Sequence, residues 1–126
     1  MTAQQIHDAG ACKRVDDGIT RVFQLLGKRW TGQIVSVLVE QPAHFTDVRR
    51  AIPGISERML SDRLTELGAA GLVLREVDEG PPLRVSYRLT EAGEALEPAL
   101  RELAEWAKKH LPDASACPSA ARADSA

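Results

Sequence analysis

Residues 53–71, PGISERMLSDRLTELGAAG, contain both start and stop signals for a single helix. The hydroxyl of Ser56 can accept a hydrogen bond from a free amide of the first turn, as an N-cap residue does. Three leucines follow at helical spacing and form one narrow apolar stripe: Leu60, Leu64 and Leu67. Gly71 suits the left-handed conformation that often ends a helix. The stretch therefore predicts an amphipathic helix whose leucines pack against a core.

The opposite side of this predicted helix is polar. Helical geometry places four side chains there: Arg58, Ser61, Asp62 and Thr65. Such a face on an isolated helix most often meets only water. The neighbouring elements therefore decide whether this face binds a partner.

The chain before residue 53 predicts further helices. Apolar residues recur at helical spacing from Val15 to Leu26, with acidic residues at the start and Gly27 as a stop. Thr31 stands where a cap would begin a second helix. Residues 34–39 are rich in β-branched side chains, which also suit a strand, but the preceding cap favours a helix.

Residues 45–52 predict a short helix that ends before Pro53. A short helix joined by a tight Pro-Gly turn to a longer capped helix is the helix-turn-helix pattern. After Gly71 the pattern alternates, with residues 72–77 and 84–89 as strands around an Asp-Glu-Gly-Pro-Pro turn. The sequence therefore predicts an α+β, mostly helical fold: a winged helix-turn-helix with a two-stranded hairpin wing.

A long C-terminal helix should begin after Thr90, with a kink at Pro98. The apolar faces of this helix and of the first helix exceed what a 126-residue monomer needs to cover. We expect these two helices to form a two-fold dimer interface through Val15, Ile19, Val22, Phe23, Leu100, Leu103 and Trp106. In a winged helix-turn-helix the second helix of the motif enters the major groove of DNA, so a dimer of this kind would bind an inverted-repeat operator.

We expect a flexible N-terminus at 1–11, one domain at 12–111 and a disordered Ala/Ser-rich tail at 112–126. The sequence has neither an apolar run that could span a membrane nor the blocks of a signal peptide, which favours a cytoplasmic protein. His7, His44 and His110 are scattered, and no metal-ligand, phosphate-loop or nucleophile motif is present. We therefore expect neither an enzyme nor a cofactor.

The net charge of −2 does not by itself favour a nucleic-acid partner. Its distribution is more informative, because the acidic excess lies towards the C-terminus. Residues 44–90 carry seven acidic side chains and seven arginines. A weakly basic face is therefore compatible with the composition.

Many separated motifs between Cys12 and Trp106 also resemble one family in their order. They are Leu26-Gly27-Lys28-Arg29-Trp30-Thr31, Phe45 with Arg49-Arg50, Pro53-Gly54-Ile55-Ser56, Met59-Leu60, Leu64 with Glu66-Leu67, Gly71-Leu72-Val73, Pro81-Pro82, Arg84-Val85 with Tyr87, and Leu89-Thr90 with Gly93. The chain thus resembles HxlR-type transcriptional regulators, relatives of the MarR-type winged helices. The resemblance implies a homodimeric regulator of double-stranded DNA.

The resemblance also implies roles for individual residues. On the DNA-facing side it places Ser56, Arg58, Ser61 and Thr65, with Arg49 and Arg50 near phosphates and Arg84 on the wing. The alternative is a solvated or ion-paired side chain for each of four arginines outside this helix: Arg49, Arg50, Arg84 and Arg88. Asp62 either accepts from a cytosine amine or holds Arg58 in place.

Several HxlR-type proteins sense oxidants or electrophiles through a cysteine before the first helix, and Cys12 occupies that place. Lys13, Arg14 and the start of the following helix would favour a thiolate there. Lys13 departs from the family's frequent proline, and an inert thiol is the alternative. A small-molecule or oxidant effector is thus one option, while the rival to DNA binding is a winged helix that only contacts proteins.

Overall fold

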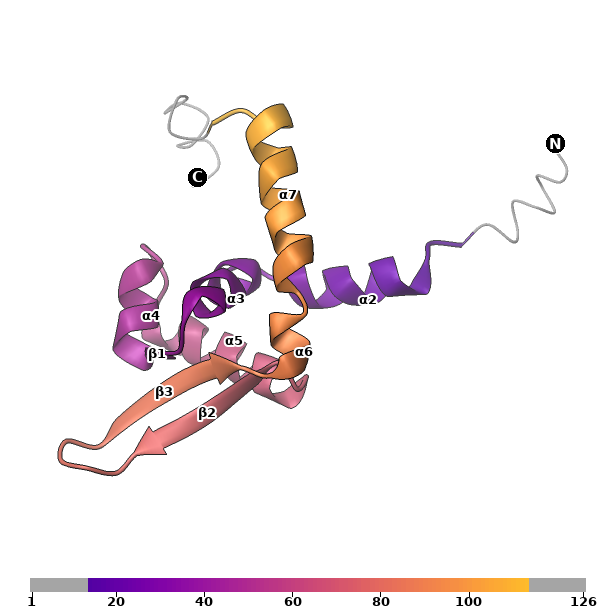
Figure 1. The fold of residues 1–126 in the computed structure, drawn as a ribbon. Helices are drawn as coiled ribbons and strands as arrows, with labels where there is room; N and C mark the ends of the chain where they lie inside the picture. Colours follow the sequence, from indigo (N-terminus) through magenta and orange to yellow (C-terminus); the bar gives the residue numbers. More distant parts are fainter. Residues whose placement is uncertain (1–13, 114–126) are drawn as a thin grey trace, which may run out of the picture.

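The computed structural model describes residues 14–113, and a winged helix-turn-helix fold, α+β and mostly helical, is confirmed there. The elements in chain order are α2 (Asp17–Leu26), α3 (Thr31–Glu40), β1 (Ala43–His44), α4 (Phe45–Ala51), α5 (Glu57–Ala69), β2 (Val73–Asp78), β3 (Arg84–Leu89), α6 (Glu91–Glu94) and α7 (Glu97–His110). Figure 1 shows α3, α4 and α5 gathered beside the sheet, while α2 and α7 extend away from it in different directions.

Helix α5 begins and ends as its sequence predicts. The Ser56 hydroxyl oxygen accepts a hydrogen bond of 3.0 Å from the Met59 amide. At the other end, Gly71 has a φ of 81°, and the Leu72 amide donates to the Leu67 carbonyl at 3.0 Å. These contacts satisfy orphan backbone groups at both ends and fix the length of the helix.

The sheet has three antiparallel strands in the order β1-β3-β2. The sequence predicted only the two-stranded hairpin, and the prediction was incomplete. Ala43 and His44 pair with Tyr87 and Ser86, which attaches the wing to the segment just before α4. A strand of two residues is too short to show the alternation by which strands are recognised.

The start of α3 differs from the prediction. Its N-cap residue is Trp30, in the left-handed conformation with a φ of 81°, and not Thr31. Thr31 is the first helical residue and is only 2% exposed, because its side chain faces the core. Its hydroxyl has no hydrogen-bond partner within residues 14–113. The helical assignment of residues 34–39 is confirmed.

The predicted long C-terminal helix with a kink is two helices, α6 and α7. Pro98 lies in the first turn of α7, and not in the interior of a helix. A proline there costs little, because the amides of a first turn have no partner within the helix. The proline therefore selects where a new helix begins.

The core draws on α3, α4, α5, the turn before α5 and the sheet. Its buried members are Ile34, Val35, Leu38, Val48, Ile52, Ile55, Leu60, Leu64, Leu67, Val73, Tyr87 and Leu89. The leucine stripe of α5 is thus buried as predicted. Neither α2 nor α7 contains a buried residue. These two helices only border the core, against which the partly buried Leu25 of α2 and Leu100 of α7 pack.

Candidate nucleic-acid interface

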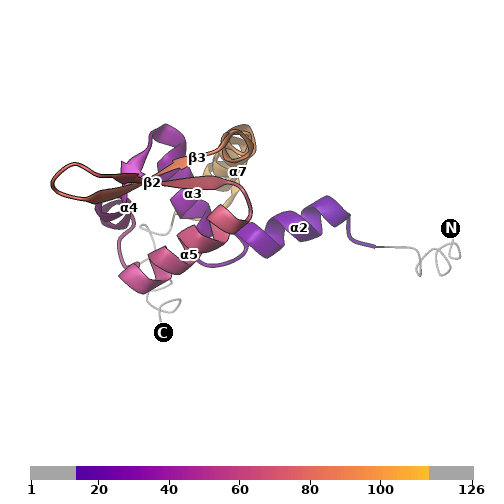
Figure 2. The ribbon, with the colours of Figure 1, turned by 90° about the horizontal axis from the view of Figure 1, so that it is seen from below.

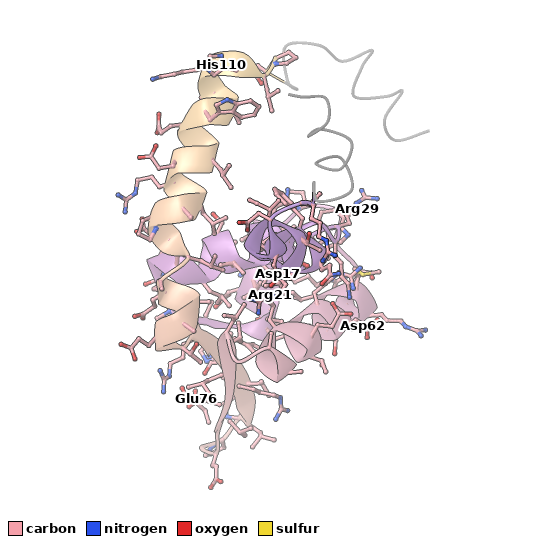
Figure 3. All side chains as sticks on the ribbon, turned by 90° about the vertical axis from the view of Figure 1, so that its right-hand side faces the viewer. Asp17, Arg21, Arg29, Asp62, Glu76 and His110 are labelled. Atoms are coloured by element: carbon pink, nitrogen blue, oxygen red, sulfur yellow. The ribbon has the colours of Figure 1, made fainter. Side chains whose placement is uncertain are left out.

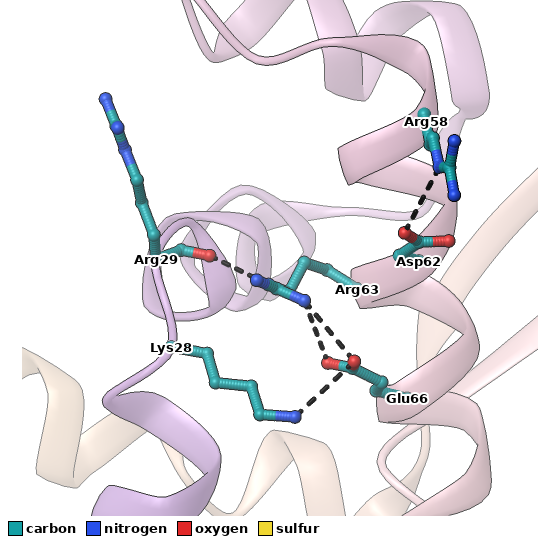
Figure 4. A network of polar contacts seen from close by, with 6 residues as sticks. All are labelled: Lys28, Arg29, Arg58, Asp62, Arg63 and Glu66. Carbon is teal, nitrogen blue, oxygen red and sulfur yellow. Dashed lines mark hydrogen bonds and ion pairs between the residues drawn. The ribbon is translucent and has the colours of Figure 1, made fainter.

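The outer face of α5 is exposed along its length. Arg58, Ser61 and Thr65 are all exposed, and the Arg58 side chain is 92% exposed. Its Nε lies 4.0 Å from Asp62 Oδ2, one turn further along, as Figure 4 shows. Such a long, exposed ion pair holds the guanidinium weakly, so Arg58 can turn towards another acceptor.

Ser56 begins this face and is itself exposed. Its oxygen accepts the capping bond from the Met59 amide, which leaves the hydroxyl proton available as a donor. One side chain can thus fix the start of α5 and still contact a ligand in front of it.

Arg49 and Arg50 lie in the last turn of α4, and both are ion-paired. Arg49 Nη1 is 3.1 Å from Glu57 Oε2, which joins the end of α4 to the start of α5. Arg50 Nη1 is 3.2 Å from Asp47 Oδ1 within α4. Both arginines are exposed, so these pairs are weak and leave donors facing solvent.

The wing has two faces that differ in chemistry. Residues directly opposite each other in an antiparallel pair share a face, and the register pairs Arg75 with Tyr87 and Asp78 with Arg84. Because Tyr87 is buried, its face points towards the helices. Arg84 therefore lies on the other face, which points away from them.

The outward face of the wing also carries Arg88, whose Nε is 3.0 Å from Glu76 Oε2. The predicted arginine-bearing face is thus present, and one of its two arginines is bound to a carboxylate. Arg75, to which the sequence reading gave no role, lies on the helix-facing side and is exposed. Strict alternation along residues 72–77 would have placed it there.

A network that the sequence reading did not find joins α5 to the segment between α2 and α3 (Figure 4). Arg63 Nε donates to the Arg29 carbonyl at 2.9 Å, and Arg63 Nη1 lies 3.3 Å from Glu66 Oε2. Lys28 Nζ lies 3.4 Å from the same carboxylate. The spacing of Arg63 and Glu66 indicates a pair on one helix, but only the fold brings Arg29 to them.

The predicted dimer residues lie on α2, just before it, or on α7, and none of them is on α5. Figure 3 places His110, at the end of α7, far from Asp62 on α5. Val15 precedes α2, while Ile19 and Phe23 on α2 and Leu103 and Trp106 on α7 are 50–56% exposed. Val22 and Leu100 are half-buried.

Cys12, the predicted redox residue, lies outside the described residues. Between residues 14 and 113, no group of His, Cys, Asp or Glu is arranged to hold a metal ion. None of the helices in this range combines the length and the hydropathy that a membrane span requires.

The Arg101 guanidinium on α7 has a raised pKa. It donates a hydrogen bond to the Glu97 carboxylate, and the negative charge of the same carboxylate adds a Coulombic contribution.

The chain matches a known family over most of its length. Residues 25–115 match the model of the HxlR-like helix-turn-helix family. The HTH-type transcriptional regulator YodB of Bacillus subtilis (strain 168) is 45% identical over 85 residues, which cover 68% of this chain and 76% of YodB.

Solved structures agree with this match. The reduced form of the transcriptional regulator YodB from B. subtilis superposes with a TM-score of 0.69 at 39% identity, covering 78% of this chain and 96% of that chain. The redox regulator HypR in its reduced form gives a TM-score of 0.70 at 34% identity, covering 74% and 92%. The chain therefore belongs to the HxlR-like helix-turn-helix family, whose members are transcriptional regulators and not enzymes.

Proposed function

We propose that this chain is a cytoplasmic, homodimeric regulator that binds double-stranded DNA by placing α5 in the major groove. The observation that carries the proposal is the contrast across α5. Its leucines are buried in the core, while its polar side chains are exposed and its start is fixed by Ser56. A rigid helix with an open polar face is what the second helix of this motif needs in order to read base edges.

Arg58 is the proposed base-reading residue. Its guanidinium can donate two parallel hydrogen bonds to the O6 and N7 atoms of guanine. Its length and 92% exposure allow that reach. Ser61 and Thr65 follow on the same face with hydroxyl groups suited to base edges or phosphates.

The remaining proposed contacts are to the DNA backbone. Ser56 would donate its hydroxyl proton to a phosphate while its oxygen caps the helix. Arg49 and Arg50 would contact phosphates beside α4, and each would exchange part of a weak carboxylate pair for the phosphate. Arg84, near the start of β3, would contact the backbone from the wing.

The test compares Arg58→Ala with Arg101→Ala. Both arginines are exposed and pair with a carboxylate four residues away on the same helix, but Arg101 lies on α7. The probes are a duplex selected by the protein from a random pool and a duplex of unselected sequence. Arg58→Ala should weaken binding to the selected duplex by about 1–3 kcal/mol, and to the unselected duplex much less.

Arg101→Ala should bind both duplexes like the wild type. Equal losses on both duplexes from Arg58→Ala would make this residue a phosphate contact and remove its base-reading role. A wild-type protein whose binding to duplex DNA does not depend on salt would overturn the DNA-binding proposal as a whole. The alternative function, a winged helix that contacts only proteins, would then be favoured.

We further propose that α2 and α7 pair with their counterparts in a second copy, and that the operator is an inverted repeat. The support is the set of half-exposed apolar side chains on these two helices: Ile19, Phe23, Leu103 and Trp106. Monomeric proteins rarely leave large contiguous apolar surfaces in water. A two-fold axis between the copies would place two α5 helices on one face of the DNA.

Regulation by oxidants is proposed through Cys12. HypR is named a redox regulator, and the YodB structure is named a reduced form. Cys12 stands next to Lys13 and Arg14, which favour a thiolate. Iodoacetamide at neutral pH should therefore alkylate Cys12 faster than free cysteine, and a rate no faster than that of free cysteine would remove the sensor role.

A further inference from the structure

The angle between α5 and the wing contains a groove whose charged residue, Arg75, has no role in the contacts assigned above. It has a volume of about 270 Å³ and is lined by Ser61, Leu64, Thr65, Gly68, Val73, Arg75 and Tyr87. Three of these residues stand at i, i+4 and i+7 and form one stripe of α5 that faces β2: Ser61, Thr65 and Gly68. Arg75 contributes the only full positive charge among the lining residues.

The arrangement of the strands explains why Arg75 lies in this groove. Arg75 is directly opposite Tyr87 in the register, and Tyr87 is buried on the helix-facing side of the sheet. The neighbouring residues Leu74 and Glu76 must therefore point to the other face. Figure 2 shows α5 and β2 diverging from the turn that joins them, and Arg75 lines the groove between these two elements.

Arg75 also differs from most arginines of the motif in its partners. Between residues 44 and 90, five arginines lie within 4.0 Å of a carboxylate: Arg49, Arg50, Arg58, Arg63 and Arg88. Arg75 and Arg84 have no such carboxylate within residues 14–113. Of these two, only Arg75 lines the groove beside the hydroxyl groups of α5. Its guanidinium can therefore meet an anion without giving up an existing pair.

We propose that this groove binds a phosphate of the DNA backbone and that Arg75 is its principal ligand, with Ser61 and Thr65 donating beside it. The proposal rests on the function proposed above. When α5 occupies a major groove and the wing lies over the neighbouring minor groove, one sugar-phosphate strand separates the two grooves. That strand must pass through the angle between α5 and β2, where Arg75 is exposed.

The chemistry of the groove fits a phosphate better than a base edge. A guanidinium donates two parallel hydrogen bonds to a phosphate, and hydroxyl groups complete the contact. A base edge lies inside a groove of the duplex and is reached by side chains on the outermost face of α5, whereas Arg75 projects from the strand beside it. Arg75 therefore contributes affinity that does not depend on sequence.

The test compares Arg75→Gln, Arg75→Lys and Arg88→Gln. Arg88 is the matched control, because it is an arginine of the same hairpin, on the opposite face and bound to Glu76. Binding is measured over a series of salt concentrations on the selected and the unselected duplex defined above. Thermal unfolding of each variant shows that the fold is retained, which the exposure of both arginines leads us to expect.

Arg75→Gln should weaken binding to both duplexes equally, by about tenfold, and should lower the salt slope by about one. Arg75→Lys should retain the slope, since the charge remains, and Arg88→Gln should match the wild type. A loss confined to the selected duplex would make Arg75 a base contact and overturn the phosphate assignment. A response of Arg75→Gln equal to that of Arg88→Gln would overturn the inference and leave DNA binding by α5 intact, whereas a wild-type protein that binds neither duplex would overturn both.

Discussion

The two outer helices, α2 and α7, differ from the winged helix that they flank in how they use their apolar residues. In the winged helix, apolar side chains of α3, α4, α5 and the sheet are buried together. In α2 and α7 no residue is buried, although both helices carry large apolar side chains. A strongly amphipathic helix therefore does not by itself indicate a place in the core of the same chain.

The largest effect expected from this comparison is on the free energy of unfolding of a core variant. Leu60 is 0% exposed and Leu103 is 51% exposed, and both are helical leucines. Leu60→Ala should cost about 2–5 kcal/mol, through lost burial and the cavity that it leaves. Urea denaturation measures the cost, which should be the same at every protein concentration.

Leu103→Ala is the control for that measurement. Its cost should fall to less than about 0.5 kcal/mol once the protein is dilute enough to be monomeric, as for an ordinary surface substitution. A cost for Leu103→Ala equal to that for Leu60→Ala in the dilute protein would mean that α7 belongs to the core, and the contrast between the two regions would fail.

The next effect concerns association. Phe23 is 56% exposed and lies on the apolar side of α2. Phe23→Glu should remove an apolar contact worth about 1.5–3 kcal/mol and place a charge in the interface, so sedimentation should show a monomer where the wild type is a dimer. The monomer should keep its far-UV circular dichroism. A wild-type protein that sediments as a monomer at micromolar concentration would remove the dimer proposal.

A smaller effect on the free energy of unfolding is expected at the contact between α5 and the segment that follows α2. Arg63, with a side chain only 17% exposed, donates to the Arg29 carbonyl in the segment between α2 and α3. Arg63→Met keeps most of the apolar stem and should cost about 1–3 kcal/mol, because the carbonyl and the Glu66 carboxylate lose a charged donor. Thermal or urea unfolding measures this cost, with Arg21→Met on α2 as a control, since Arg21 is paired with Asp17 and both side chains are exposed. Equal costs for the two variants would show that the contact does not join the two regions.

The sequence predicted best the elements whose signals are local. The cap at Ser56, the leucine stripe and the left-handed Gly71 all lie within α5 or at its ends, and each was found where the sequence predicted it. The errors arose where a tertiary contact decided the outcome. Thr31 has the residue type of an N-cap, but its side chain is buried in the core. Residues Ala43 and His44 form a strand only because β3 lies beside them.

The residues of the candidate site also fall into those that local sequence signals predict and those that depend on tertiary contacts. Helical periodicity alone gave the exposed positions of Arg58, Ser61 and Thr65 on α5. The carboxylate partners of Arg49 and Arg88 lie on other elements of the fold, at Glu57 and Glu76. The position of Arg75 in the groove depends on strand register and on the angle between the wing and α5.

The smallest expected effect on the free energy of unfolding comes from the N-cap of α5, which we compare with a serine on the exposed face of the same helix. Ser56 accepts the Met59 amide, whereas Ser61 is exposed in the middle of the same helix and does not cap it. Ser56→Ala should lower the free energy of unfolding by about 1 kcal/mol, and Ser61→Ala should leave it within about 0.5 kcal/mol of the wild type. Urea denaturation distinguishes the two, and Ser56→Asp should restore stability because a carboxylate also caps a helix and favours its positive end. If Ser56→Ala cost no more than Ser61→Ala, the capping bond would contribute nothing to stability, and the fixed start of α5 would have to come from the packing of Ile55 and Leu60, both of which are buried.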